Sequence, residues 1–94
     1  DSEESLDLAF SSKRQHANWQ VFATACGGPV SGESPSLDWM RWAEVVNHVH
    51  LFARIDLPPR ASCRVMIASD IWNDLELIIE TTDGFIWYHW STTA

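Results

Sequence analysis

Basic side chains are scarce in this 94-residue sequence. Lysine and arginine together number six, against 13 aspartates and glutamates, and the formal net charge is −7. Only one of the six bases, Lys13, is a lysine. So acidic a chain repels the phosphates of nucleic acids and of anionic membranes. The balance argues against nucleic-acid and membrane partners. It favours a basic protein partner, or self-association.

Long apolar runs and catalytic motifs are also missing. No stretch approaches the ~20 apolar residues of a membrane span. The Gly/Pro/Ser-rich residues 26–36 lack the lysine of a phosphate loop, and no GxSxG elbow is present. His48 and His50 would point ~200° apart on a helix, so they do not form a metal pair. The sequence therefore predicts no metal, no cofactor and no catalytic residue, and it favours binding over catalysis.

Cysteine is nearly absent, because Cys26 and Cys63 are the only two. Two cysteines do not make a disulfide-dense pattern. They would pair in a secreted chain and stay reduced in a cytosolic one. The sequence leaves both outcomes open.

The most informative stretch runs from Leu75 to Thr92, where two β-branched and aromatic runs flank Asp83-Gly84. That dipeptide is a strong signal for a type I′ hairpin turn, which needs positive φ at both central residues. A two-residue loop there pairs Thr82 with Phe85, and it also pairs Glu80 with Trp87. We therefore predict a β-hairpin in this register.

Alternation along the hairpin separates two faces. One is almost wholly apolar and is predicted to be core: Leu75, Leu77, Ile79, Thr81, Ile86, Tyr88 and Trp90. The other mixes acids with aromatics: Glu76, Ile78, Glu80, Thr82, Phe85, Trp87 and His89. If a helix covers this second face too, its aromatics are core. If not, they form an exposed surface.

The remaining chain predicts helices and further strands. Ser2 as a cap, with acids early and bases late, favours a helix over 2–17, although Leu6, Leu8 and Phe10 would also alternate as a strand. Residues 18–25 alternate and predict a strand. Ser36 begins a helix over 37–52, residues 60–69 form a strand, and residues 70–74 form a turn.

These elements predict a single α+β domain over residues 1–94. Two helices pack on a mainly antiparallel four-stranded sheet that ends in a β-meander, in the order α-β-α-β-β-β. Residues 1–5 are open to fraying, and residues 26–36 form a loop. With 94 residues there is no room for a second core.

The favoured hypothesis is a small protein-interaction domain, such as an inhibitor, an immunity-type protein or an accessory subunit. It would bind a basic partner through the acidic and aromatic sheet face, because aromatics supply hot spots and acids supply steering. The predicted contact residues are Glu76, Glu80, Phe85, Trp87 and His89. One alternative is a ligand-binding protein or enzyme with an apolar pocket, whose polar residues would be His48, His89, Tyr88 and Asp70. Another is a small secreted toxin or effector.

Overall fold

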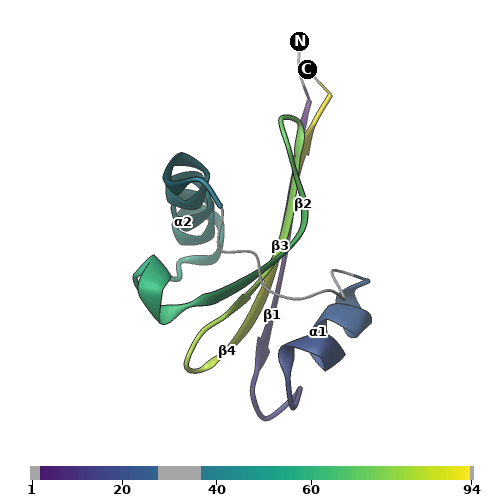
Figure 1. Cartoon of the computed structure of the whole chain (residues 1–94), viewed down its shortest axis with the longest axis vertical. Coiled ribbons are helices and arrows are strands. Elements are labelled where there is room, and N and C mark those ends of the chain that lie inside the picture. Colours follow the sequence, from purple (N-terminus) through teal and green to yellow (C-terminus); the bar gives the residue numbers. More distant parts are fainter. Residues whose placement is uncertain (1–2, 28–36, 94) are drawn as a thin grey trace.

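The computed structural model describes residues 3–27 and 37–93. It contains a four-stranded antiparallel sheet of order β1-β4-β3-β2, with one helix on each face (Figure 1). The strands are β1 (Glu4–Ser12), β2 (Arg64–Ile71), β3 (Asp74–Glu80) and β4 (Gly84–Thr92). The helices are α1 (Trp19–Cys26) and α2 (Trp39–Ala53), and a 3-10 turn spans Arg60–Ser62. The predicted α+β class with a C-terminal meander is confirmed.

The first two elements exchange places relative to the prediction. The predicted helix over 2–17 is wrong, because Glu4–Ser12 pairs with β4 along its whole length, from Glu4 opposite Thr92 to Ser12 opposite Gly84. The alternation of Leu6, Leu8 and Phe10, which predicted a strand, was the correct signal for this segment. Sheet hydrogen bonds along nine residues outweigh a favourable charge order, which contributes only ~0.3–1 kcal/mol per charge.

The predicted strand over 18–25 is instead the helix α1. The Asn18 side chain accepts a hydrogen bond from the Val21 backbone nitrogen at 3.0 Å, and Gly27 ends the helix at φ 72°. Both are standard helix-end devices. Trp19, Phe22 and Ala23 recur at helical spacing and are buried, so the apolar alternation read from this segment was coincidental.

The later elements lie close to their predicted positions. Helix α2 begins at Trp39, where the Asp38 carboxylate caps it by accepting from the Met40 nitrogen at 3.2 Å. The predicted cap Ser36 and most of the predicted loop lie outside the described residues. Strand β2 begins at Arg64 rather than residue 60, because Arg60–Ser62 form the 3-10 turn.

The β3–β4 hairpin has a different register from the predicted one. Glu80 pairs with Phe85 and Ile78 with Trp87, a shift of two residues. Within residues 3–27 and 37–93 positive φ occurs only at Arg54 and Gly27, so the predicted type I′ turn at Asp83-Gly84 is wrong. Because a strand's side chains alternate with period two, the shift leaves the residues within β3 and β4 on their predicted faces.

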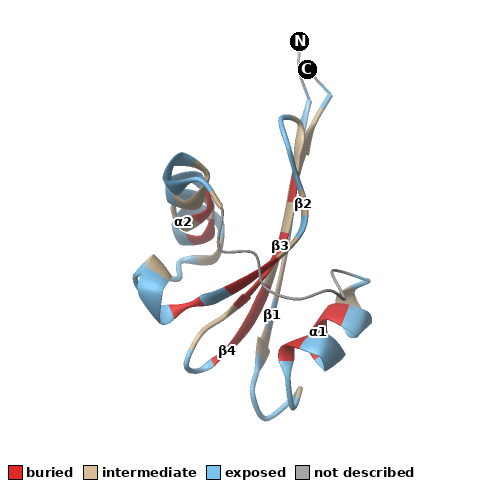
Figure 2. Ribbon diagram, in the orientation of Figure 1, coloured by how far each residue is buried: buried red, intermediate tan, exposed pale blue. Residues whose placement is uncertain are grey.

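Each face of the sheet carries its own apolar cluster (Figure 2). The face under α2, which we call the α2 face, is the predicted core face. Its buried cluster is Val45, Val49, Cys63, Val65, Leu75, Leu77, Ile79, Ile86 and Tyr88. The opposite face, the α1 face, buries Trp19, Phe22, Ala23, Met66, Ile78 and Phe85. Trp90, predicted as core, is only half-buried at the margin of the first cluster.

Candidate functional site

Helix α1 covers only part of the predicted binding face. Its cluster lies over Met66, Ile78 and Phe85, near the β3–β4 turn. Toward the β2–β3 turn the face is open, and one row across the sheet places Asp7, His89, Glu76 and Ser69 side by side. Trp87 lies between this row and the α1 cluster. The sheet therefore brings Glu76, Trp87 and His89 together, as predicted from the alternation.

Hydrogen bonds hold this open patch in place. The Trp87 indole nitrogen donates to Glu76 Oε2 at 2.9 Å, and His89 Nε2 lies 2.8 Å from Asp74 Oδ1. The Trp87 and His89 rings are 5.9 Å apart. A hydrogen bond from Ser69, and secondarily His89, lowers the pKa of Asp74 against the opposing effect of its desolvation. Asp74 therefore stays charged beside a half-exposed histidine.

Asp74 was absent from the predicted contact residues, although the sequence contained a signal for it. It stands two residues before Glu76, so the same alternation puts both carboxylates on the α1 face. The prediction treated Asp74 as part of a turn. In fact β2 continues to Ile71 and β3 begins at Asp74, which leaves Trp72 and Asn73 as the connection.

Two of the predicted contact residues do not belong to the open patch. Phe85 is only 2% exposed and stacks on Phe22 of α1, with ring centroids 5.7 Å apart. Its expected exposure is therefore wrong, because α1 packs on that part of the sheet. Glu80 already has basic partners within the chain, since its carboxylate lies 3.1 Å from Lys13 Nζ and 3.3 Å from Arg64 Nη1.

Charge is strongly segregated along the sheet. The end at the β2–β3 turn, which we call the acidic end, carries Glu3, Glu4, Asp7, Asp70, Asp74 and Glu76. Of the six bases in the sequence only Arg41 reaches this end, where it contacts Asp70 and the Ile71 carbonyl. The bases Lys13 and Arg64 lie at the opposite end, beside Glu80 and the β3–β4 turn. The acidic end thus combines an excess of carboxylates over basic side chains with Trp87 and the exposed Trp72.

The α2 face contributes a cavity at the same end. This acidic-end cavity measures ≈ 400 Å³ and is lined by Glu4, Arg41, Glu44, His48, Trp72 and Trp90. His48 Nδ1 lies 2.7 Å from the hydroxyl of Tyr88, which is 1% exposed. Burial, and to a lesser extent Glu44, raises the pKa of that hydroxyl. The phenol is therefore held neutral beneath the cavity.

The residues proposed for a ligand-binding or catalytic pocket do not form one site. His48 and Tyr88 are in contact, but His89 lies on the α1 face, on the other side of the sheet. Asp70 lies 3.6 Å from Arg41 Nε, so a basic side chain is already paired with it. A single pocket containing both histidines is thus excluded by the topology.

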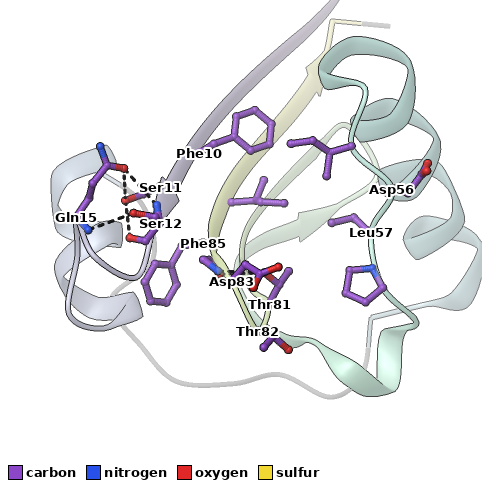
Figure 3. A pocket seen from close by; sticks show the side chains of 14 residues that line it. Phe10, Ser11, Ser12, Gln15, Asp56, Leu57, Thr81, Thr82, Asp83 and Phe85 are labelled. Carbon is purple, nitrogen blue, oxygen red and sulfur yellow. Dashed lines mark hydrogen bonds between the residues drawn. The ribbon is translucent and has the colours of Figure 1, made fainter.

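A second cavity lies at the opposite end of the sheet, between β1 and the connection after α2 (Figure 3). It measures ≈ 630 Å³, and Phe10, Leu57 and Ile86 form its apolar walls. Ser12, Gln15 and Asp83 add polar groups at the same cavity. Among the described residues no histidine and no tryptophan lines it, so it differs from the pocket that the sequence suggested.

Thiol and metal chemistry receive no support from the part of the chain that the structure describes. Cys26 packs against the α1-face cluster and Cys63 belongs to the α2-face cluster, so the sheet separates them and both are free. Burial raises the pKa of each thiol, which disfavours the reactive thiolate. No group of three or more His, Cys, Asp or Glu within residues 3–27 and 37–93 is placed to hold a metal ion.

No helix in the described ranges has the length and apolar character needed to cross a membrane. Comparison with protein-family models, with curated proteins and with solved structures finds no match for this chain.

Proposed function

We propose that this domain binds a basic partner protein through the acidic end of its sheet. The observation that carries the proposal is the charge segregation, in which six carboxylates share one end with a single arginine. Like charges held together repel one another, and a partner's lysines and arginines would relieve that repulsion. The proposed contact surface is the open patch of Asp7, Asp74, Glu76, Trp87 and His89.

The aromatic residues support protein binding rather than simple salt binding. Trp87 is half-buried, and its indole is fixed by Glu76, so it would lose little rotamer freedom on contact. Rigid tryptophans surrounded by polar groups are typical binding hot spots. Glu80 and Phe85 are left out of the proposed surface, because one is paired with bases and the other is buried.

The test compares two double variants that remove equal charge from opposite ends. Asp7→Asn/Glu76→Gln neutralises the acidic end, and glutamine can still accept the Trp87 hydrogen bond. Asp56→Asn/Asp83→Asn removes two exposed carboxylates near the opposite-end cavity. Partners captured from a cell extract on the unaltered domain are identified by mass spectrometry, purified, and measured against all three proteins.

We expect the acidic-end variant to slow association about tenfold at low salt, because steering acts mainly on the association rate. Its rate should also depend less on salt, since screening acts over about 10 Å at 0.1 M. The opposite-end variant should bind almost as well as the parent. Equal losses in both variants, or an association rate that does not change with salt, would refute the proposal.

A further inference from the structure

The acidic-end cavity is a concave site that the proposed contact patch does not use. It lies on the α2 face, whereas Glu76, Trp87 and His89 lie on the α1 face. Strand β1 supplies Glu4, strand β4 supplies Trp90, and helix α2 supplies Glu44 and His48. Trp72, at the β2–β3 turn, completes the lining and is 69% exposed.

The charges that line this cavity do not cancel. The Arg41 guanidinium donates to the Ile71 carbonyl at 2.5 Å and lies 3.6 Å from Asp70, so its charge already has a carboxylate partner. Glu4 accepts a hydrogen bond from the neutral Trp90 indole at 3.0 Å, which leaves its charge uncompensated. Within residues 3–27 and 37–93, no hydrogen bond or ion pair engages the Glu44 side chain.

Two further observations identify the kind of group that fits. Burial is the largest cause of the raised pKa of the Tyr88 hydroxyl. Glu44 raises this pKa further, Arg41 lowers it, and Glu4 raises it with the smallest effect, so the charged groups of the cavity act on the phenol beside His48 and Glu44 acts most strongly. Arg41 itself lies over the Trp90 ring, with 5.8 Å between the guanidinium carbon and the ring centroid. The cavity wall thus already accepts one guanidinium on an indole face, while the indole of Trp72 is free to accept another cation.

We infer that the acidic-end cavity receives an arginine or lysine side chain of the basic partner. The inference rests on the proposed function and adds a specific subsite to it. A volume of ≈ 400 Å³ is ample for one long side chain. Glu4 and Glu44 would pair with its charged head, and the Trp72 indole would pack against its head or its methylene stem. An anionic group would be repelled by the same carboxylates.

The first experiment uses a small probe and no partner. N-acetyl-arginine amide is titrated into the ¹⁵N-labelled domain, and the indole N–H signals of Trp72 and Trp90 are followed by NMR. N-acetyl-citrulline amide is the control, because it has nearly the same shape and no charge. We expect weak, saturable shifts at these two tryptophans with the arginine probe only. Shifts scattered over the whole acidic surface, or equal shifts with citrulline, would overturn the inference.

Matched variants then locate the effect. Glu44→Gln should weaken binding of the arginine probe about fivefold, as should Trp72→Ala, the loss expected for one exposed ion pair or one cation–π contact. Asp56→Asn removes the same charge from an 89% exposed side chain outside the cavity and should leave binding unchanged. An equal loss in Asp56→Asn would mean that only net charge matters, which would also overturn the inference.

Two more measurements are needed. One distinguishes a protein side chain from a free cationic ligand, and the other tests the subsite separately from the proposed function. Agmatine, a free guanidinium ligand, should bind no more tightly than the arginine probe, and binding ten times tighter would assign the cavity to a free metabolite instead. Glu44→Gln should weaken a purified partner about fivefold, independently of Asp7→Asn/Glu76→Gln. If the partner responds only to Asp7→Asn/Glu76→Gln, the proposed function stands and the subsite is wrong.

Discussion

Replacing Gly84 tests why a glycine stands at the start of β4. A Cβ at this position would lie far inside van der Waals contact with the Ser11 carbonyl oxygen and 3.2 Å from the Ser12 Cα. Both neighbours are backbone atoms of β1, so no side-chain rotation relieves the clash. Gly84→Ala must therefore push β1 away from β4 near the Ser12–Gly84 pair.

The cost of Gly84→Ala can be estimated from what the displacement breaks. Overpacking costs typically ~1–3 kcal/mol. The pairing around Ser12 and the bond from the Lys13 nitrogen to the Asp83 carbonyl would weaken, at ~1 kcal/mol for each hydrogen bond lost. We expect a loss of about 3 kcal/mol in urea unfolding, and a Tm lower by roughly 10–20 °C for a domain of this size.

A second substitution distinguishes two reasons for a glycine at position 84, which are a close approach to the β1 backbone and a turn that needs positive φ. Asparagine tolerates positive φ, so Gly84→Asn would be mild in a type I′ turn. Against a backbone clash it should be at least as damaging as alanine, because its Cβ meets the same atoms. A Gly84→Asn protein nearly as stable as the parent would refute the close-approach argument.

Burial raises the pKa of Tyr88, the only tyrosine, above its ordinary value of 10.0, so the unfolded chain ionises near that pH and the folded protein does not. Stability from this group is complete below pH ~10 and is lost as pH rises, so phenolate absorbance should appear together with unfolding in an alkaline titration; phenolate in a folded protein would contradict this. The lowered pKa of Asp74 has the opposite sign: its stabilisation is complete above its unfolded value of 3.8 and is lost as pH falls through the lower folded value. Asp74→Asn should therefore melt below the parent at pH 7, and the difference should shrink in acid; a gap independent of pH would exclude this account. Phe85→Ala should cost about 3–5 kcal/mol in urea unfolding as a core truncation, and a near-neutral result would mean that α1 does not cover it. Trp87→Ala should weaken partner binding by at least ~2 kcal/mol, whereas unchanged affinity would remove Trp87 from the contact surface.

The face of the sheet on which each hairpin side chain lies was predictable from the sequence, because it depends only on whether the residue number is odd or even within its strand. The hairpin register was wrong by two residues, yet Glu76, Trp87 and His89 still fall together, because a shift of two preserves the alternation. The register itself depended on contacts outside the hairpin. Gly84 approaches β1 closely, which a local turn signal does not contain.

The N-terminal third was misassigned for a related reason. Strand β1 has no partner nearby in sequence: its Glu4 bonds Trp90, 86 residues away. The alternation of Leu6, Leu8 and Phe10 was therefore a strand signal without a local pairing partner, and the prediction gave more weight to the cap and charge signals. Asn18 is a typical helix N-cap residue, but the prediction relied on the apolar alternation of residues 18–25 and did not use this signal. The position of α1, and hence the burial of Phe85, is a tertiary property that no local pattern contains.

The long sequence separation between β1 and β4 also sets the order in which this sheet can be completed. During synthesis β1 is made about 80 residues before β4, its strand partner in the described sheet, which at 5–20 residues per second is an interval of about 4–16 s. Helix α1 also waits, although for a shorter time, because it packs on Ile78 of β3 and Phe85 of β4. Throughout that interval the apolar side chains of Leu6, Leu8 and Phe10 have no sheet on which to pack. The charge of Asp7, which lies between Leu6 and Leu8, disfavours pairing of this segment with another nascent chain.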